Sequence, residues 1–189
     1  HPHANKMGVY RASDDWEVLG VAEPDPERRK SLAGSELYGD LPLMTVEQAL
    51  DLPAVEAVGI ETEIRDLLKY AEMAIDADLP IHLDKPAGVS FPDFQRLYRK
   101  ADAKLLPIQM GYMYRFNPAV QFMRDCLEKG WLGEPFEVLT VMSKVVPPRT
   151  REELAEFAGG IMFELAGHIV DLTVDVLGKP DRVTAYPRT

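Results

Sequence analysis

Short apolar runs alternate with longer amphipathic segments through the first 110 residues, and this alternation restricts the possible folds more than any other feature of the sequence. Apolar runs of about four to six residues have the length of buried strands, and the segments between them have the length of helices. Strands separated by helices run parallel, with helices covering both faces of their sheet. The sequence therefore predicts an α/β fold built on a parallel sheet.

The expected strands of this part are Glu17–Ala22, Val55–Ile60, Pro80–Leu83 and Leu105–Met110. The expected helices are a short one that ends near Gly34, one from Thr45 to about Leu50, and two longer ones, Glu63–Ala77 and Pro92–Ala103. Thr45 with Gln48 forms a capping-box pattern, and Ser90 can cap the last of these helices.

The pattern changes after Gly111. A helix from Pro118 to Lys129 is expected, then an extended run over Phe136–Val145, a helix from about Ile161 to Gly178, and a strand that begins near Arg182. One or two strands cannot bury a sheet face. The sequence therefore predicts a first domain over residues 1–111 and an incomplete α/β domain over residues 112–189.

Composition excludes several functional classes. The chain has 31 acidic and 21 basic residues and a net charge of −10, which argues against binding to nucleic acid or to an anionic membrane surface. No apolar run approaches the roughly 18–20 residues of a membrane span, and no signal peptide is visible. The single cysteine, Cys126, excludes an internal disulfide, and its apolar surroundings indicate a buried, inert thiol. These features favour a cytoplasmic protein.

Polar residues that follow the expected strands are the first candidates for a site, because parallel sheets bind ligands at the carboxyl ends of their strands. Glu23 follows the first strand, Glu61, Thr62 and Glu63 the second, and Asp84 with Lys85 the third. We expect all of these except Glu63 to contact a cofactor.

Glu23 has the chemistry of a ribose ligand, because its carboxylate can accept a hydrogen bond from each ribose hydroxyl. The same charge would repel a 2′-phosphate, which favours NAD over NADP. The alternative is a solvated acid in a proline-rich turn. A glycine-rich turn is expected before this strand but is not in the sequence, and His1 and His3 would lie just beyond it, near the cofactor.

Lys85 stands between a buried strand and Pro86. Proline disfavours a helical conformation for the residue before it, so the lysine is held extended at the strand tip. An ammonium group there can polarise a substrate oxygen during hydride transfer. The alternative is an ordinary exposed lysine.

Glu164, His168 and Asp171 have helical spacing and would share one stripe of an otherwise apolar helix. A histidine oriented by carboxylates in a cleft can act as a general base. One alternative is a polar stripe that faces solvent and is extended by Asp175. A metal site is another, but one histidine with two carboxylates on one helix is weak support for it, and we expect no metal.

Four segments together resemble the glucose–fructose oxidoreductase, inositol dehydrogenase and rhizopine-catabolism family (Gfo/Idh/MocA). They are residues 20–25 (GVAEPD), 83–86 (LDKP), 111–118 (GYMYRFNP) and 159–171, from the glycine pair to His168 and Asp171. The resemblance runs over essentially the whole chain. It implies a Rossmann-type parallel-sheet domain, here without its first strand and Gly-x-Gly turn. It also implies a second α/β domain, cut short here, whose open, mainly antiparallel sheet often forms homo-oligomers.

The resemblance also implies roles for individual residues. Lys85 matches the lysine of a Glu-Lys-Pro motif that contacts substrate and nicotinamide, although the acid before it here is Asp84. His168 matches the catalytic histidine, and Glu164 stands where that family usually has an aspartate. Tyr114 and Arg115 match a segment that lines the cleft, where we expect Tyr114 to bind substrate with Asp171, and Arg115 to bind the cofactor.

The resulting hypothesis is an NAD-dependent oxidoreductase that acts on a sugar, polyol or related carbonyl or alcohol. Lys85 would polarise the reacting oxygen, His168 would transfer its proton, and Glu164 would orient His168 or bind substrate. Two alternatives remain open. One is a non-catalytic dinucleotide-binding or sensing protein of the same fold, and the other is an NAD-dependent glycosidase.

Overall fold

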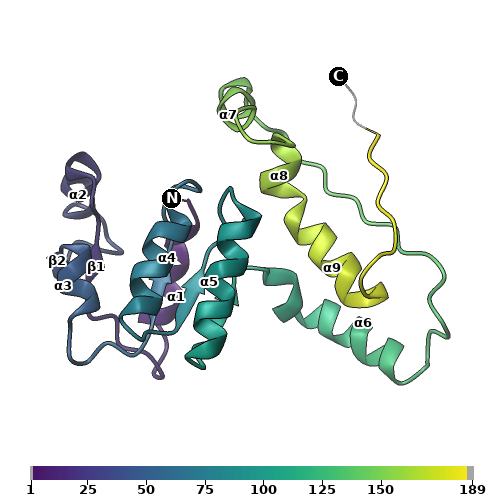
Figure 1. Ribbon diagram of the computed structural model, residues 1–189, viewed down its shortest axis with the longest axis horizontal. Helices are drawn as coiled ribbons and strands as arrows, with labels where there is room; N and C mark the ends of the chain where they lie inside the picture. The colour runs from purple at the N-terminus through teal and green to yellow at the C-terminus, as the bar shows by residue number, and fades with distance from the viewer. Residues whose placement is uncertain (1, 187–189) are drawn as a thin grey trace. The chain divides into compact units, whose positions relative to one another are not determined.

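The computed structural model describes residues 2–186, with side chains from Ala4 onward. The chain forms two compact units, His1–Gly111 and Tyr112–Thr189, and each is described by itself. Figure 1 shows the course of the chain from one unit to the other.

Parallel strands form two small sheets in the first unit. Strand β1 (Val21–Ala22) pairs with β2 (Leu43–Met44), and β4 (Ile81–Leu83) lies between β3 (Val58–Ile60) and β5 (Ile108–Met110). Every pair is parallel, with Ile60 opposite Leu83 and Leu83 opposite Met110. The predicted α/β fold with parallel strands is confirmed.

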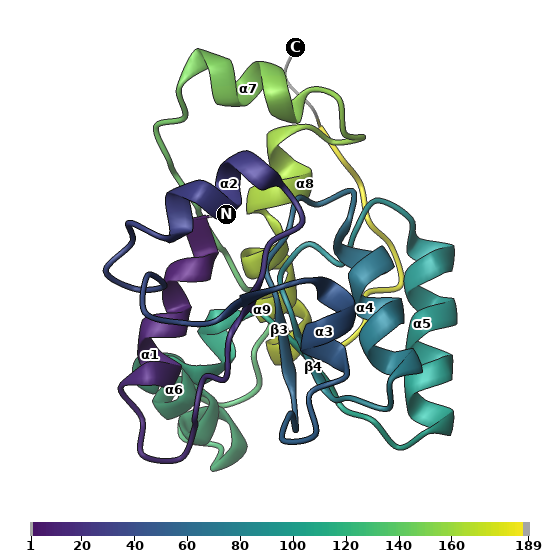
Figure 2. The same cartoon turned by 90° about the vertical axis from the view of Figure 1, so that its left-hand side faces the viewer.

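Helices cover both faces of the three-stranded sheet. Figure 2 shows β3 and β4 between α1 (Met7–Arg11) on one side and α4 (Leu67–Asp76) with α5 (Phe91–Ala103) on the other. The core lies on the α4 and α5 side and consists of Ile60, Leu67, Ala71, Ala74, Ile75, Ile81, Leu83, Leu97 and Ala101. Side chains alternate between the two faces of a strand. His82 therefore points to the α1 face, away from this core.

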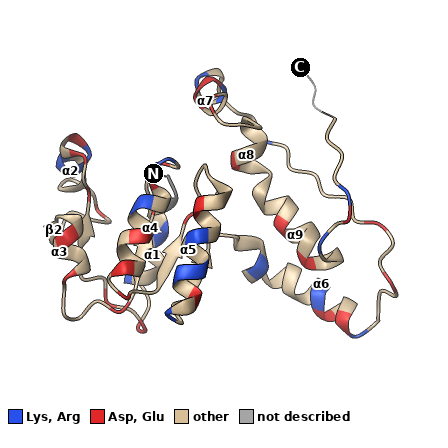
Figure 3. Ribbon diagram, viewed as in Figure 1, with Lys and Arg blue, Asp and Glu red and all other residues tan. Residues whose placement is uncertain are grey.

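Ion pairs join α4 to α5 across their exposed surfaces. Lys100 on α5 pairs with Glu72 at 3.2 Å and Asp76 at 2.5 Å on α4, and Lys104 pairs with Asp78 at 2.7 Å. Figure 3 shows acidic and basic residues interspersed along these two helices. Such exposed pairs contribute about 1 kcal/mol or less each, so the apolar core supplies most of the packing energy.

Two predicted helix starts are confirmed in atomic detail. Helix α3 (Val46–Leu50) begins with a complete capping box, in which the Thr45 hydroxyl accepts from the Gln48 backbone and the Gln48 side chain accepts from the Thr45 backbone. The Ser90 hydroxyl accepts the Asp93 backbone N–H at the start of α5. These caps satisfy backbone N–H groups that have no partner within the helix.

Two features of the first unit differ from expectation. Strand β1 is only Val21–Ala22, because a strand extends only where a neighbour pairs with it, and its partner β2 has two residues. Strand β2 was not expected, and two short helices, η1 (Pro2–Lys6) and α1, come before β1. Gly20 permits the close approach of the segment before β2, because a Cβ there would lie 2.8 Å from the Pro42 carbonyl oxygen.

The second unit is helical in its described part. Its elements are η2 (Met113–Phe116), α6 (Pro118–Glu128), α7 (Pro148–Leu154), α8 (Ile161–Leu165) and α9 (Gly167–Leu177). Asn117 caps α6 by accepting the N–H groups of Ala119 and Val120. Cys126 on α6 is buried, as predicted. Helix α7 and the 3-10 turn η2 were not expected.

The extended run over Phe136–Val145 forms no strand, and the predicted open antiparallel sheet is not found among residues 112–186. The segments expected to be strands have no hydrogen-bonded neighbour there, and an extended segment becomes a strand only in a ladder. Phe136, Leu139, Val141 and Val145 are 76% to 96% exposed. Homo-oligomerisation through a sheet of this unit stays a prediction, which light scattering on the full-length protein would test.

Within residues 2–186, no helix is both long enough and apolar enough to cross a lipid bilayer.

Candidate functional site

The carboxyl ends of β3 and β4 bring together three residues predicted from the sequence. Glu61 follows β3, and Asp84 and Lys85 follow β4, with the Asp84 backbone N–H bonded to the Ile60 carbonyl at 3.1 Å. Asp84 and Lys85 are only 2% and 3% exposed. The alternative that Lys85 is an ordinary exposed lysine is therefore wrong. Long charged side chains are seldom buried this deeply without a structural or functional reason.

Asp84 holds the backbone at the lysine. Its Oδ1 accepts the Lys85 backbone N–H at 2.9 Å, so one carboxylate oxygen defines where the Lys85 side chain begins. A Cβ at Gly111 would lie 3.4 Å from the same oxygen, which leaves little room above the carboxylate. The aspartate, which is one methylene shorter than the glutamate of the similar motif, thus fixes the backbone of Lys85.

Lys6 enters this cluster from the N-terminal segment and was not found by sequence reasoning. Its ammonium group forms an ion pair with Glu61 and lies 3.9 Å from Asp84 Oδ1. Burial raises the pKa of Glu61, an effect that Lys6 opposes and the Asp84 charge reinforces. No local pattern marks Lys6, because its partners are distant in sequence. Lys6 supplies the positive charge that makes two neighbouring buried carboxylates tolerable.

His82 connects this cluster to α1. Its Nε2 lies 3.2 Å from Lys6 Nζ, and its Nδ1 lies 3.2 Å from the Tyr10 hydroxyl. A lysine ammonium only donates, so Nε2 accepts and Nδ1 carries the proton toward Tyr10. Burial and the Lys6 charge together lower the pKa of His82, although Asp84 works against them.

The depressed pKa of His82 predicts a loss of stability in acid. Below pH 6.5, the ordinary histidine value, the unfolded chain takes up a proton that folded His82 refuses, so stability falls as the pH falls. The slope from one such group is at most about 1.4 kcal/mol per pH unit. His82→Gln keeps an acceptor for Lys6. In this variant the melting temperature should fall less between pH 7 and pH 5 than it does in the wild type. If the melting temperature of this variant changes with pH as it does in the wild type, the pKa of His82 is not depressed.

Glu23 lies in an ordered turn after β1. Its Oε1 accepts the Asp25 backbone N–H at 2.9 Å, and the Arg29 guanidinium donates two bonds to its carbonyl oxygen at 2.7 and 2.9 Å. Asp25 in turn caps α2 (Pro26–Leu32). The Glu23 carboxylate is therefore oriented before any ligand arrives, although this geometry agrees with a ribose ligand and with a solvated turn acid alike.

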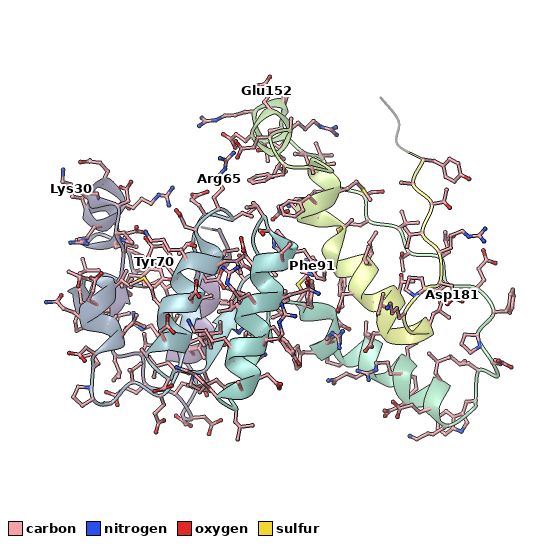
Figure 4. The ribbon with its side chains drawn as sticks, viewed as in Figure 1. Lys30, Arg65, Tyr70, Phe91, Glu152 and Asp181 are labelled. Carbon is pink, nitrogen blue, oxygen red and sulfur yellow. The ribbon has the colours of Figure 1, made fainter. Side chains whose placement is uncertain are left out.

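A hollow of about 260 Å³ opens beside this turn. It is lined by Pro24, Arg29, Thr45, Val46, Glu47, Lys69, Tyr70 and Met73. Pro24 and Thr45 follow β1 and β2, so the hollow lies at the carboxyl ends of these strands. Figure 4 labels Tyr70 on the side of α4 that faces α3.

Thr62 and Glu63 lie in the loop after β3, where the Thr62 hydroxyl donates a hydrogen bond to the Glu63 carbonyl oxygen at 3.2 Å.

His168 is buried in the second unit between two tyrosines. It is 9% exposed, and its ring centroid lies 6.3 Å from that of Tyr112 and 5.7 Å from that of Tyr114, with edge-to-face geometry in both cases. Gly167 allows this packing, because a Cβ there would already lie 3.6 Å from the Tyr112 ring. Tyr114 is thus next to His168, as expected of two residues that share a site.

Asp171 and Asp175 face the protein rather than solvent. Their side chains are 12% and 9% exposed, whereas the apolar residues Val170, Val174 and Leu177 of the same helix are exposed. The alternative of a solvent-facing polar stripe is wrong. Figure 3 shows acidic residues on α9 and basic residues on the neighbouring α6.

Arg115 binds both carboxylate oxygens of Asp171, at 2.7 and 2.9 Å, and lies 3.5 Å from Asp175. Arg124 on α6 adds a contact to Asp175 at 3.2 Å. The structure engages Arg115 and Asp171 with each other, and their expected contacts with cofactor and substrate stay predictions. The paired charges tie η2 and α6 to α9 and thereby fix the helix that carries His168.

Glu164 and His168 are not in one uninterrupted helix, contrary to expectation. Helix α8 ends at Leu165, and α9 begins at Gly167, with a turn at Ala166 between them. A small-residue pair that includes glycine is a common place for a helix to break. His1 lies outside the described residues, and the side chain of His3 also lies outside them.

Lys85 and His168 belong to different units, so the predicted convergence of the two on one substrate stays a prediction. Among the residues that the structure describes, His, Cys, Asp and Glu side chains do not gather in a group of three that could hold a metal ion.

Comparison with known proteins finds a family model that matches the C-terminal part of the chain. Residues 120–189 match the family described as the GFO/IDH/MocA C-terminal domain. The chain is 25% identical over 187 residues to D-apiose dehydrogenase of Rhizobium rhizogenes, covering 96% of this chain and 52% of the relative. It is 26% identical over 155 residues to the rhizopine catabolism protein MocA of Rhizobium meliloti, covering 82% and 47%.

The fold has close structural relatives. An NAD-binding protein from Listeria innocua superposes with a TM-score of 0.75 at 20% identity, covering 94% of this chain and 52% of that one. At this identity the likeness shows the fold alone. The chain spans about half the length of the curated relatives it matches.

Proposed function

We propose that this chain belongs to the GFO/IDH/MocA family and is part of a nicotinamide-dependent oxidoreductase that acts on a sugar, polyol or related alcohol or carbonyl. The observation that carries the proposal is the buried Lys85 at the carboxyl end of β4, with Asp84 bracing its backbone. A lysine in this position has the chemistry to bind a substrate oxygen.

The residues present fit the two ends of a dinucleotide. Glu23 is pre-oriented at the end of β1, where a ribose ligand is required. The adjoining hollow combines apolar side chains such as Val46, Tyr70 and Met73 with the charged ones of Arg29, Glu47 and Lys69, a lining that suits a flat ring with hydrogen-bonding groups. Glu61 and Asp84 stand at the ends of β3 and β4 in the three-stranded sheet. The glycine-rich turn that would cradle the pyrophosphate is not part of this sequence.

The residues of this chain would divide the work of the reaction. When bound, the nicotinamide ring supplies or accepts the hydride. Lys85 donates a hydrogen bond to the reacting oxygen and stabilises negative charge on it, and His168 takes or returns the proton of that oxygen. The His168 ring is buried, and its edge-to-face contacts with Tyr112 and Tyr114 hold it in one orientation. Glu164 remains a candidate to orient His168 or to bind substrate.

The proposed cofactor is NAD. The Glu23 carboxylate would accept hydrogen bonds from ribose hydroxyls and repel a 2′-phosphate. Calorimetry on the full-length protein should therefore show tighter binding of NAD than of NADP. Glu23→Ala together with a nearby arginine should move the preference toward NADP, whereas Glu17→Ala, at an exposed acid before the same strand, should not. Equal wild-type affinities for the two cofactors would remove Glu23 as the ribose ligand.

A non-catalytic dinucleotide sensor of the same fold is the main rival, and an NAD-dependent glycosidase is a variant that would use the same groups. The burial of both Lys85 and His168 favours an enzyme, because a sensor gains nothing from holding a desolvated ammonium and imidazole in place.

A further inference from the structure

The cations of helix α2 are all engaged by acceptors close to the proposed ribose site. Arg28 Nη2 lies 2.6 Å from Glu63 Oε1, the Arg29 guanidinium binds the Glu23 carbonyl oxygen, and Lys30 lies 2.7 Å from Glu27. Glu23 and Glu27 follow β1, whereas Glu63 lies in the loop that follows β3. The Arg28–Glu63 pair therefore joins helix α2, which follows β1, to the loop that follows β3.

The charge of Arg28 also interacts with the carboxylate of Glu23, the residue proposed to bind the ribose. The hydrogen bond and charge of Glu63 raise the pKa of Arg28 most, and the carboxylates of Glu23 and Asp25 raise it further. Arg28 therefore lies among three carboxylates. A 2′-phosphate placed at Glu23 would need a guanidinium partner, but Arg29 is bound to the Glu23 carbonyl oxygen and Arg28 is bound to Glu63.

We propose that Glu63 is a specificity-determining residue that restricts the adenosine site to ribose without a 2′-phosphate. It does so by holding the Arg28 guanidinium in an ion pair, so that this group is not available to a 2′-phosphate. This inference rests on the proposed cofactor site, and it adds a residue that does not itself need to touch the ribose.

The pair is suited to this role because it can open without disturbing the fold. The side chains of Arg28 and Glu63 are 50% and 58% exposed, so separating them leaves no buried charge behind. Exposed ion pairs contribute little to stability. Removing Glu63 would thus leave the fold intact and free the Arg28 fork to bind phosphate in bidentate geometry.

Calorimetry with two fragments of the cofactors, 5′-AMP and 2′,5′-ADP, tests the proposal on the full-length protein. Glu63→Gln should tighten the binding of 2′,5′-ADP by roughly tenfold, the size expected for one new charge-assisted contact. Its affinity for 5′-AMP should stay within about twofold of wild type, because ribose hydroxyls do not need Arg28. Adding Arg28→Ala to Glu63→Gln should abolish the gain.

The matched control is Glu27→Gln, which removes another exposed carboxylate paired with a cation on α2. It should leave the ratio of the two affinities unchanged. An equal gain in Glu27→Gln would reduce the effect to net charge and overturn the proposal, as would an unchanged ratio in Glu63→Gln. Wild-type protein that binds neither fragment would overturn the proposed cofactor site itself, whereas normal 5′-AMP binding with no effect of Glu63 would overturn only this inference.

Discussion

Replacement of Lys85 or His168 by alanine in the full-length protein is expected to lower kcat by about 10²–10⁴-fold while NAD affinity stays largely intact. The reason is that each residue would act on the reacting oxygen and its proton, and a positioned acid–base group contributes on this scale. NADH formation, followed by absorbance across a panel of polyols and aldoses, gives kcat, and calorimetry gives the NAD affinity.

Controls separate chemistry from folding in this test. Lys85 is buried, so Lys85→Met, which keeps most of the side-chain volume, should be as inactive as Lys85→Ala but closer to wild type in stability. Lys30→Ala removes a well-exposed lysine and should retain full turnover. If both Lys85→Met and His168→Ala turn over at the wild-type rate, the pair has no catalytic role and the sensing alternative gains support.

Leu83→Ala is expected to lower the free energy of unfolding of the first unit by about 2–5 kcal/mol. Leu83 is fully buried in the middle strand of the three-stranded sheet, so its truncation leaves a cavity that β3, β5 and α4 cannot easily fill. Urea unfolding followed by circular dichroism measures the loss from the transition midpoint at constant slope.

Leu43→Ala is the matched control, because Leu43 also lies in a short parallel strand but is 37% exposed. Leu43→Ala should lower the free energy of unfolding clearly less than Leu83→Ala does. Equal losses for the two variants would mean that the sheet core is not the main source of stability in this unit.

Local patterns in the sequence were sufficient for much of the first unit. The alternation of apolar runs with amphipathic segments predicted parallel strands, and the Thr45–Gln48 box and Ser90 predicted helix starts that the structure confirms. Pro86 and the strand before it placed Lys85 at a strand tip. These features depend on neighbours within a few residues, so the sequence determines them directly.

The tertiary structure decided what depends on distant partners. Lys6 meets His82 across 76 positions of the chain, and Arg115 meets Asp171 across 56, and no local pattern foretells either contact. Only the packed fold shows that the acidic stripe of α9 faces inward and its valines outward. The expected sheet of the second unit failed for the same reason. Apolar alternation makes a segment able to be a strand, but a strand exists only when another segment supplies its hydrogen bonds.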